Sequence, residues 1–214
     1  MKTSAAPILQ IFAREPTAGA VKTRLAAVVG AERAAAAYRA LTEVTMQQAA
    51  RAQALGIVAA VELWCTPVAD SPWFQTCAAT ATASLHLQPA GDLGSRMRAA
   101  LLDGLTRADA VLLIGTDCPV LDVPDMAAAA ALLATHDAVL ILAEDGGFVL
   151  VGARVPLTFE DVRMSTQHAA MDTLAAFDRA SIRCGLLSAL WDVDEIADLE
   201  RWHRLLSAAR TTTP

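Results

Sequence analysis

The sequence predicts an α/β fold, a three-layer α/β/α sandwich around a mostly parallel mixed sheet with one antiparallel strand. Two observations favour it. Short apolar runs bounded by Gly, Pro and Asp alternate with longer Ala-, Leu- and Arg-rich segments of helical spacing. No internal repeat or low-complexity linker divides the 214 residues, which suffice for one sizeable core. We therefore expect a single domain over residues 1–214.

Predominantly apolar runs are typical of strands buried on both faces of a parallel sheet. In chain order they cover residues 8–13, 57–64, 110–115, 138–143 and 148–151, with weaker candidates at 85–88 and 182–187. Helices are expected between them, at residues 31–54, 93–107, 124–135, 166–180 and 195–208. Only residues 144–147 separate two of the strands. That link is too short for a parallel crossover, so these two strands run antiparallel or lie apart.

Composition excludes several classes of function. A formal net charge of −6 argues against a nucleic-acid partner, and no apolar stretch is long enough for a membrane span. The four cysteines lack paired spacing, which favours reduced thiols and a cytoplasmic location. The four histidines lack zinc-site spacing, and no serine-hydrolase elbow is present. Cys118 has no His nearby in sequence and precedes a proline, so a thiol mechanism is disfavoured.

The loop after the first strand, Arg14 to Arg24, resembles a phosphate-binding loop. Pro16 and Val21 stand where a P-loop requires glycines, which excludes a P-loop NTPase. What remains is a turn at Gly19 followed by Lys22 and Arg24 near a helix N-terminus, where two cations would attract phosphates. The alternative is that both are solvated surface charges.

Two acidic segments follow apolar strands. Asp117 ends the run at 110–115, at the edge where a divalent cation would bridge carboxylate and phosphate oxygens. Asp192 and Asp194 precede the last helix, and one of them would complete a Mg²⁺ or Mn²⁺ site. Helix or turn capping is the alternative explanation for all three aspartates.

Two further loops carry polar residues and glycines. In the first, Gly91, Asp92 and Arg96 stand at the start of a helix, where they would hold a base edge or a phosphate; an ordinary Asp cap with a surface arginine is the alternative. In the second, carboxylates and glycines meet at a strand end, where an ordinary tight turn is the alternative. Its residues are Glu144, Asp145, Gly146 and Gly147.

Taken in order, these motifs resemble the nucleotide-diphospho-sugar transferase-like family, GT-A-type glycosyltransferases often associated with arsenosugar biosynthesis. The motifs are FAREPxxGxVKTRL, GDLGxRM, GTDCP, EDGGFxLxG and DVDxxxDL, and they span most of the chain. The wider group includes nucleotidyltransferases of the phospholactate guanylyltransferase type, whose S/T-R-L element is similar to Thr23 to Leu25. The chain departs from a literal D-x-D, because Cys118 and Pro119 follow Asp117.

The resemblance implies roles for the residues above. Lys22 and Arg24 would contact nucleotide phosphates, with Gly19 in their turn, and the loop of Gly91, Asp92 and Arg96 would lie near the base or ribose. Asp117 would hold Mg²⁺ or Mn²⁺ with Asp194, or with Asp192 in its place. The loop from Glu144 to Gly147 would bind the acceptor, and Lys22, Asp117 and Asp145 would take part in catalysis.

The implied activity is metal-dependent transfer of a glycosyl group from a nucleotide-diphospho-sugar to a small acceptor. The alternative is transfer of a nucleoside monophosphate from a nucleoside triphosphate to a phosphorylated small molecule, with release of pyrophosphate. A third possibility is a non-catalytic nucleotide-binding protein, suggested by the single carboxylate at Asp117. Oligomeric state is not indicated by the sequence.

Overall fold

A computed structural model describes residues 6–211. All of its strands join one seven-stranded sheet in the order β3-β2-β1-β4-β6-β5-β7. The strands are β1 (Ile8–Arg14), β2 (Ala60–Thr66), β3 (Ser84–Leu87), β4 (Val111–Ile114), β5 (Ala138–Ala143), β6 (Phe148–Ala153) and β7 (Cys184–Leu190). Every pairing is parallel except the two made by β6, which is antiparallel to β4 and β5. The predicted mixed sheet with one antiparallel strand is therefore confirmed.

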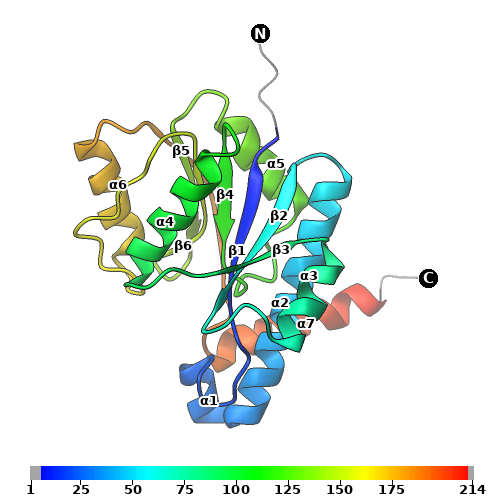
Figure 1. The fold of residues 1–214 in the computed structure, drawn as a ribbon. Helices are drawn as coiled ribbons and strands as arrows, with labels where there is room; N and C mark the ends of the chain where they lie inside the picture. Colours follow the sequence, from blue (N-terminus) through cyan, green and yellow to red (C-terminus); the bar gives the residue numbers. More distant parts are fainter. Residues whose placement is uncertain (1–5, 212–214) are drawn as a thin grey trace.

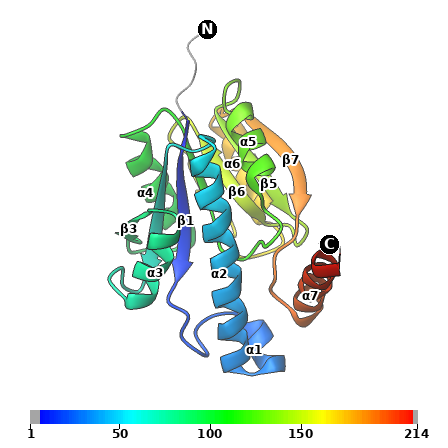
Figure 2. The ribbon, with the colours of Figure 1, turned by 90° about the vertical axis from the view of Figure 1, so that its right-hand side faces the viewer.

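Helices cover both faces of the sheet, as predicted for a three-layer fold (Figures 1 and 2). They are α1 (Thr23–Val29), α2 (Ala31–Ala54), α3 (Pro72–Thr80), α4 (Leu93–Leu105), α5 (Val123–Leu132), α6 (Ala169–Arg179) and α7 (Ile196–Thr211). Alternate residues of β1 enter the two cores: Leu9 and Ile11 pack toward α2, α3 and α5, and Phe12 packs toward α4 and α6. None of the helices in residues 6–211 is long and apolar enough to cross a membrane.

The helices α1 and α7 extend the molecule beyond one edge of the sheet, at the bottom of Figure 1. They meet through a separate apolar cluster that includes Leu25 of α1, Leu41 of α2 and Trp202 of α7. Trp191 and Val193, which lead from β7 into α7, belong to the same cluster. The first and last helices are thus packed together, although most of the chain separates them.

Local chemistry explains where the structure departs from the sequence prediction. The second strand begins at Ala60 and not at residue 57, because Gly56 adopts φ 70° and ends α2 in a turn closed by the bond from Ile57 N to Ala52 O (2.9 Å). Helix α3 was not predicted. Its signal is Ser71 followed by Pro72: the Ser71 hydroxyl accepts a hydrogen bond from Phe74 N (3.2 Å) and caps the helix.

The second apolar run also hides a buried charge, Glu62, which is only 2 % exposed. Its carboxylate accepts hydrogen bonds from Gln10 Nε2 and Trp64 Nε1, both 3.1 Å, and pairs with Arg107. Burial would raise the pKa of Glu62, but these donors outweigh it and lower the pKa. This network ties β1 and β2 to the end of α4.

At Gly152, within the sheet, the neighbouring side chains leave no room for a Cβ. A Cβ added at Gly152 in β6 would lie 2.5 Å from Val139 Cγ1 and 2.9 Å from Leu112 Cδ2. Gly152→Ala should therefore lower the free energy of unfolding by about 1–3 kcal/mol through overpacking, as measured by urea unfolding. Gly115→Ala is the matched control, since nothing lies within 4 Å of the added Cβ, and equal losses in both variants would contradict the prediction.

Candidate functional site

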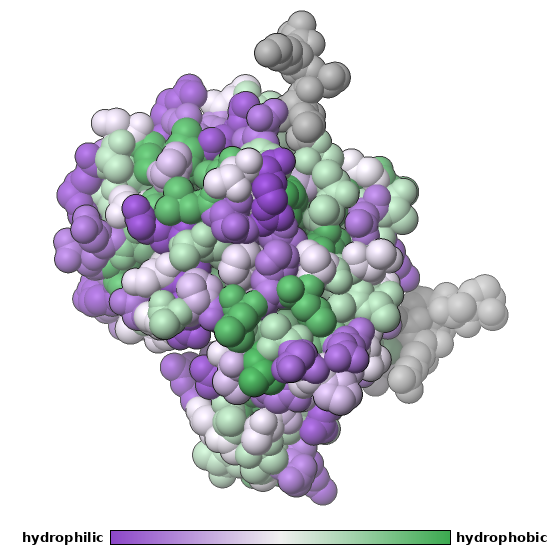
Figure 3. Space-filling model, viewed as in Figure 1, coloured by the Kyte–Doolittle hydropathy of each residue, from purple (hydrophilic) through white to green (hydrophobic). Residues whose placement is uncertain are grey.

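A cleft of about 590 Å³ lies along the edge of the sheet where the parallel strands end. Its walls come from the loops after β1, β4, β5 and β7, which carry Lys22, Asp117, Asp145 and Asp194. In the space-filling view the outline is indented between the lobe that contains α1 and the body of the sheet (Figure 3). The edge at which the sequence predicts chemistry is thus hollow.

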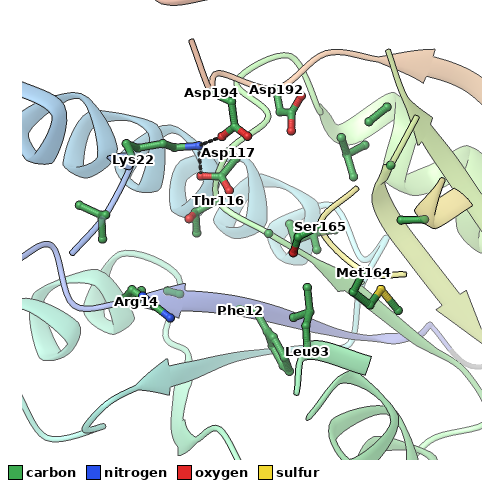
Figure 4. A pocket seen from close by; sticks show the side chains of 18 of the residues that line it. Phe12, Arg14, Lys22, Leu93, Thr116, Asp117, Met164, Ser165, Asp192 and Asp194 are labelled. Atoms are coloured by element: carbon green, nitrogen blue, oxygen red, sulfur yellow. Dashed lines mark hydrogen bonds and ion pairs between the residues drawn. The ribbon is translucent and has the colours of Figure 1, made fainter. Parts of the chain in front are cut away.

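The ammonium group of Lys22 lies between two carboxylates from distant parts of the chain (Figure 4). Its Nζ is 2.7 Å from Asp117 Oδ1 and 2.9 Å from Asp194 Oδ1. The Lys22 side chain is 5 % exposed, whereas Asp117 and Asp194 are 44 % and 38 % exposed, so the carboxylates face the cleft. Arg24 Nη1 lies 3.5 Å from the second oxygen of Asp194. The solvated-charge alternative therefore fails for Lys22.

The backbone brings these groups together at both ends. Lys22 precedes α1 in the left-handed region, at φ 47°, a conformation that is costly for a residue other than glycine. Asp117 O accepts a hydrogen bond from Val193 N (2.9 Å), which fixes the loop after β7 against the loop after β4. One backbone bond thus places Asp194 beside Asp117.

Electrostatics favour a charged Lys22. Burial alone would lower its pKa, but the adjacent carboxylates of Asp117 and Asp194 outweigh burial and raise the pKa above its ordinary value. The site therefore holds a permanent cation between two anions. This ammonium group can stabilise phosphate oxygens wherever they displace one of the carboxylates.

Capping does not account for the aspartates. Helix α5 is capped by Asp122, which accepts a hydrogen bond from Asp125 N (3.2 Å). The amides of Asp194 and Glu195 donate to the carboxylate of Asp198 (3.2 and 2.9 Å), inside α7. The side chains of Asp117 and Asp194 are therefore not used as the caps of these helices.

Asp192 is partly buried and lies near two other carboxylates. Desolvation, followed by the charges of Asp145 and Asp194, raises the pKa of Asp192 to about 6, against a smaller opposing effect of Lys22. This value implies that Asp145, at the end of β5, acts electrostatically on Asp192, at the end of β7. A carboxyl group with a pKa near neutrality is suited to proton transfer.

The loop from Glu144 to Gly147 divides between two tasks. Asp145 and Gly147 line the cleft, and Asp145 Oδ1 accepts a hydrogen bond from Gly147 N (2.8 Å). Glu144 does not line it: its carboxylate binds Arg201 of α7 (2.7 and 3.2 Å), whose guanidinium stacks on Trp191. Gly146 has φ 91° and lies so close to Gln167 that a Cβ would meet its carbonyl oxygen at 2.2 Å.

Of Gly91, Asp92 and Arg96, only Arg96, in the first turn of α4, lines the cleft. Asp92 caps the helix, accepting a hydrogen bond from Ser95 N at 2.7 Å that lowers the pKa of Asp92. The capping alternative is therefore correct for Asp92. Gly91 and Gly19 have φ 120° and 81° and shape the loops without lining the cleft.

Sequence reasoning missed a buried hydroxyl at the centre of the site. Tyr38 Oη accepts hydrogen bonds from Arg14 N (2.8 Å) and Thr116 Oγ1 (3.2 Å). Burial and the charge of Asp117 raise the pKa of Tyr38. Tyr38 is one of the buried residues on the inner face of α2, and a tyrosine at such a position is expected to be a core residue. No sequence signal therefore distinguishes it. It joins the loops after β1 and β4.

The geometry fits a divalent cation held by few protein ligands. No three His, Cys, Asp or Glu side chains among residues 6–211 are grouped as a metal site. Asp117 and Asp194 together offer two carboxylates, and Asp117 Oδ1 is buried without a hydrogen-bond donor, the Lys22 ion pair aside. Mg²⁺ is commonly held by one or two carboxylates together with substrate phosphates. The donor set is therefore compatible with a metal bound jointly with a nucleotide.

The thiols play no part in this chemistry. All four cysteines are free. Burial raises the pKa of Cys118 to about 12, so at neutral pH it is not the thiolate that nucleophilic catalysis requires. The exclusion of a thiol mechanism is consistent with the structure.

Asp192 gives the stability of the metal-free protein a specific pH dependence. Its pKa is about 6 in the folded protein and near 3.8 when unfolded, so the folded state binds more protons between these values and stability falls as pH rises from about 4 to 6. Asp192→Asn should remove up to about 2 kcal/mol of that loss, as measured by urea unfolding at pH 4.5 and 7. An unchanged pH dependence would contradict the raised pKa.

Comparisons with known proteins place the fold and the family. A protein from Desulfovibrio desulfuricans G20, provisionally named a nucleotide-diphospho-sugar transferase, superposes with a TM-score of 0.81 at 29 % identity, covering 93 % of this chain and 87 % of that one. The 4-diphosphocytidyl-2C-methyl-D-erythritol synthase of Anaerococcus prevotii gives 0.59 at 9 % identity, covering 95 % and 99 %.

A third solved structure contains a metal ion. The glucosyl-3-phosphoglycerate synthase of Mycobacterium tuberculosis, in complex with Mn²⁺, UDP and glucosyl-3-phosphoglycerate, gives a TM-score of 0.55 at 13 % identity over 92 % of this chain and 75 % of that one. No curated protein matches the sequence. The comparisons bear out the predicted fold and the predicted class of enzyme, a transferase.

A family model described as "Uncharacterized protein conserved in bacteria (DUF2064)" matches residues 45–166, more than half of the chain. The matched region contains β2 to β6 and the Asp117 loop but stops short of Asp194, and it begins after Lys22. The chain therefore belongs to the DUF2064 family, and its fold is that of the nucleotide-diphospho-sugar transferases.

Proposed function

We propose that this protein transfers a glycosyl group from a nucleotide-diphospho-sugar to a small-molecule acceptor with the help of Mg²⁺ or Mn²⁺. The observation that carries the proposal is the Lys22 ammonium group, 5 % exposed and held between Asp117 and Asp194 at the carboxyl ends of the strands. The likeness to the Desulfovibrio protein supports it. We assign the activity to one domain over residues 1–214, because all described strands form one sheet.

Lys22 and Arg24 would bind the diphosphate of the donor. Lys22 can exchange a carboxylate for a phosphate oxygen without a change in its own burial. Arg24 is 63 % exposed, and its contact with Asp194 is long, at 3.5 Å, so its side chain is free to turn toward a phosphate. Both cations then stabilise the negative charge that develops on the departing nucleoside diphosphate.

Asp117 and Asp194 would hold the metal together with phosphate oxygens, and Asp192 is the reserve ligand. When bound, the metal supplies further charge stabilisation at the phosphates. Lys22 keeps the two carboxylates close together before the nucleotide arrives.

Asp145 and Gly147 would contact the acceptor. Glu144, through Arg201, and Gly146, through its close contact with Gln167, would hold the turn in position. The acceptor hydroxyl oxygen forms a bond to the sugar carbon as the bond from that carbon to the phosphate oxygen breaks. Asp145 or Asp192 takes the hydroxyl proton, and a pKa of about 6 suits Asp192 to that role. We place the reaction in the cytoplasm, in keeping with four free cysteines.

A second candidate is nucleotidyl transfer, favoured by the likeness of the fold to that of 4-diphosphocytidyl-2C-methyl-D-erythritol synthase and of a protein named a nucleotidyl transferase. In that reaction an acceptor phosphate attacks the α-phosphorus of a nucleoside triphosphate and pyrophosphate leaves. Lys22 and Arg24 would then contact a triphosphate.

The released product separates the two reactions. Incubation with a panel of nucleotide-diphospho-sugars, nucleoside triphosphates and sugar phosphates should release nucleoside diphosphate, and Asp117→Asn should lower that rate by about two orders of magnitude or more. Release of pyrophosphate from a triphosphate would establish the alternative instead. Absence of any metal-dependent nucleotide binding to the wild-type protein, measured calorimetrically with Mn²⁺, would contradict both.

Lys22 should also limit metal binding to the free protein. Lys22→Met removes the cation that shares both carboxylates, so Mn²⁺ affinity without nucleotide should rise while nucleoside-diphosphate affinity falls. The free energy of unfolding without metal should drop by roughly 1–3 kcal/mol, between the values for exposed and buried ion pairs. Arg33→Met, at an exposed position of α2, is the control. Unchanged Mn²⁺ affinity in Lys22→Met would place the metal elsewhere.

A further inference from the structure

Gln88 follows β3, the edge strand of the sheet, and lines the cleft. It thus lies at one side of the Lys22 cluster, which is made of Lys22, Asp117 and Asp194. Its backbone N–H donates to Cys65 O (2.8 Å), which continues the pairing of β3 with β2. Its side-chain Nε2 donates to the carbonyl oxygens of Ala13 (3.2 Å) and Trp64 (2.9 Å). One carboxamide thus bridges the ends of β1 and β2.

Those two bonds fix which way the amide faces. Only the NH₂ group can satisfy two carbonyl oxygens, so the amide oxygen must point the other way. There Oε1 accepts a hydrogen bond from Arg96 Nη1 (3.3 Å). The orientation of the acceptor for Arg96 is therefore set by the backbone of the sheet.

Arg96 is held along one side. Its Nε donates to Asp92 O (3.3 Å) in the first turn of α4, and Nη1 donates to Gln88. Its Nη2 donates to no group among the described residues, and the side chain lines the cleft. A guanidinium group fixed by two of its nitrogens presents the third to a ligand with little further loss of conformational freedom.

We propose that Gln88 is a positioning residue, which holds the Arg96 guanidinium so that Nη2 donates to a hydrogen-bond acceptor of the bound nucleotide. Gln88 itself has its amide hydrogens committed to Ala13 and Trp64, so it acts through Arg96 and does not read the ligand. The inference rests on the proposed function, because it takes the ligand of the cleft to be a nucleotide.

A double-mutant cycle tests the coupling of the two residues. The variants are Gln88→Met, Arg96→Ala and the double variant, and the probes are UDP, GDP, CDP and ADP, each with Mn²⁺ in a calorimeter. For the diphosphate that binds the wild-type protein best, Gln88→Met should weaken binding about tenfold, but less than twofold once Arg96 is alanine. Gln75→Met, at an exposed position of α3, is the control for the substitution and should leave affinity unchanged.

Gln88→Glu gives a second measurement, including the case in which Gln88→Met fails to fold. Glutamate has the shape of glutamine and keeps an acceptor for Arg96. It places carboxylate oxygen against the carbonyl oxygens of Ala13 and Trp64, however, and its negative charge offsets the positive charge of the Arg96 guanidinium. The affinity for the nucleoside diphosphate should fall at least as far as in Gln88→Met, and the difference in affinity between Gln88→Glu and the wild-type protein should be smaller at high salt.

Equal weakening by the Gln88 substitution in the presence and absence of Arg96, or no weakening at all, would overturn the positioning role and leave the proposed function intact. Failure of all four diphosphates to bind the wild-type protein would overturn the proposed function, and the inference with it.

Discussion

The Lys22 ammonium group pairs with Asp117 and Asp194, which come from distant segments of the chain, and the arrangement of the cleft depends on these two ion pairs. Asp117 and Asp194 would repel each other across the cleft if the ammonium group were absent. The position of Lys22 in turn depends on α1, whose Leu25 packs into the cluster with Trp191 and Trp202. The apolar packing between α1 and α7 and the ion pairs of Lys22 in the cleft therefore stabilise each other. The DUF2064 match covers only one of these three segments, the one with Asp117.

Periodicity and strand-end logic suffice to predict most of this fold. The residues 138–143 and 31–54 expected for β5 and α2 coincide with the observed elements, because a wholly apolar run and a long alanine-rich segment each have one stable placement. The short link at 144–147 correctly predicts the antiparallel strand. Helix α3 escapes the prediction because its residues lack a helical pattern beyond the cap at Ser71.

The site is predicted less completely, for a physical reason. Lys22, Asp117 and Asp194 follow from chemistry at strand ends. Side-chain direction within one loop does not: Glu144 and Asp145 are adjacent acids, and only packing against Arg201 decides that the first faces α7. Residues that act by joining strands, such as Tyr38 and Gln88, have no sequence signal, because their partners are backbone atoms or groups far away in the chain.

The reversed strand has a consequence for how such a site can change. Because β6 begins at the cleft and ends at the opposite edge, the chain must return before α6 can start against Gly146. The return segment, residues 154–168, brings Met164, Ser165 and Thr166 into the cleft, and it contains no strand or helix. Leu157 and Phe159 anchor this segment in the core with α4 and α6, so variation that spares the sheet is confined to the part that lines the cleft. Changes in that part can therefore alter which molecules the cleft admits while Lys22, Asp117 and Asp194 stay in place.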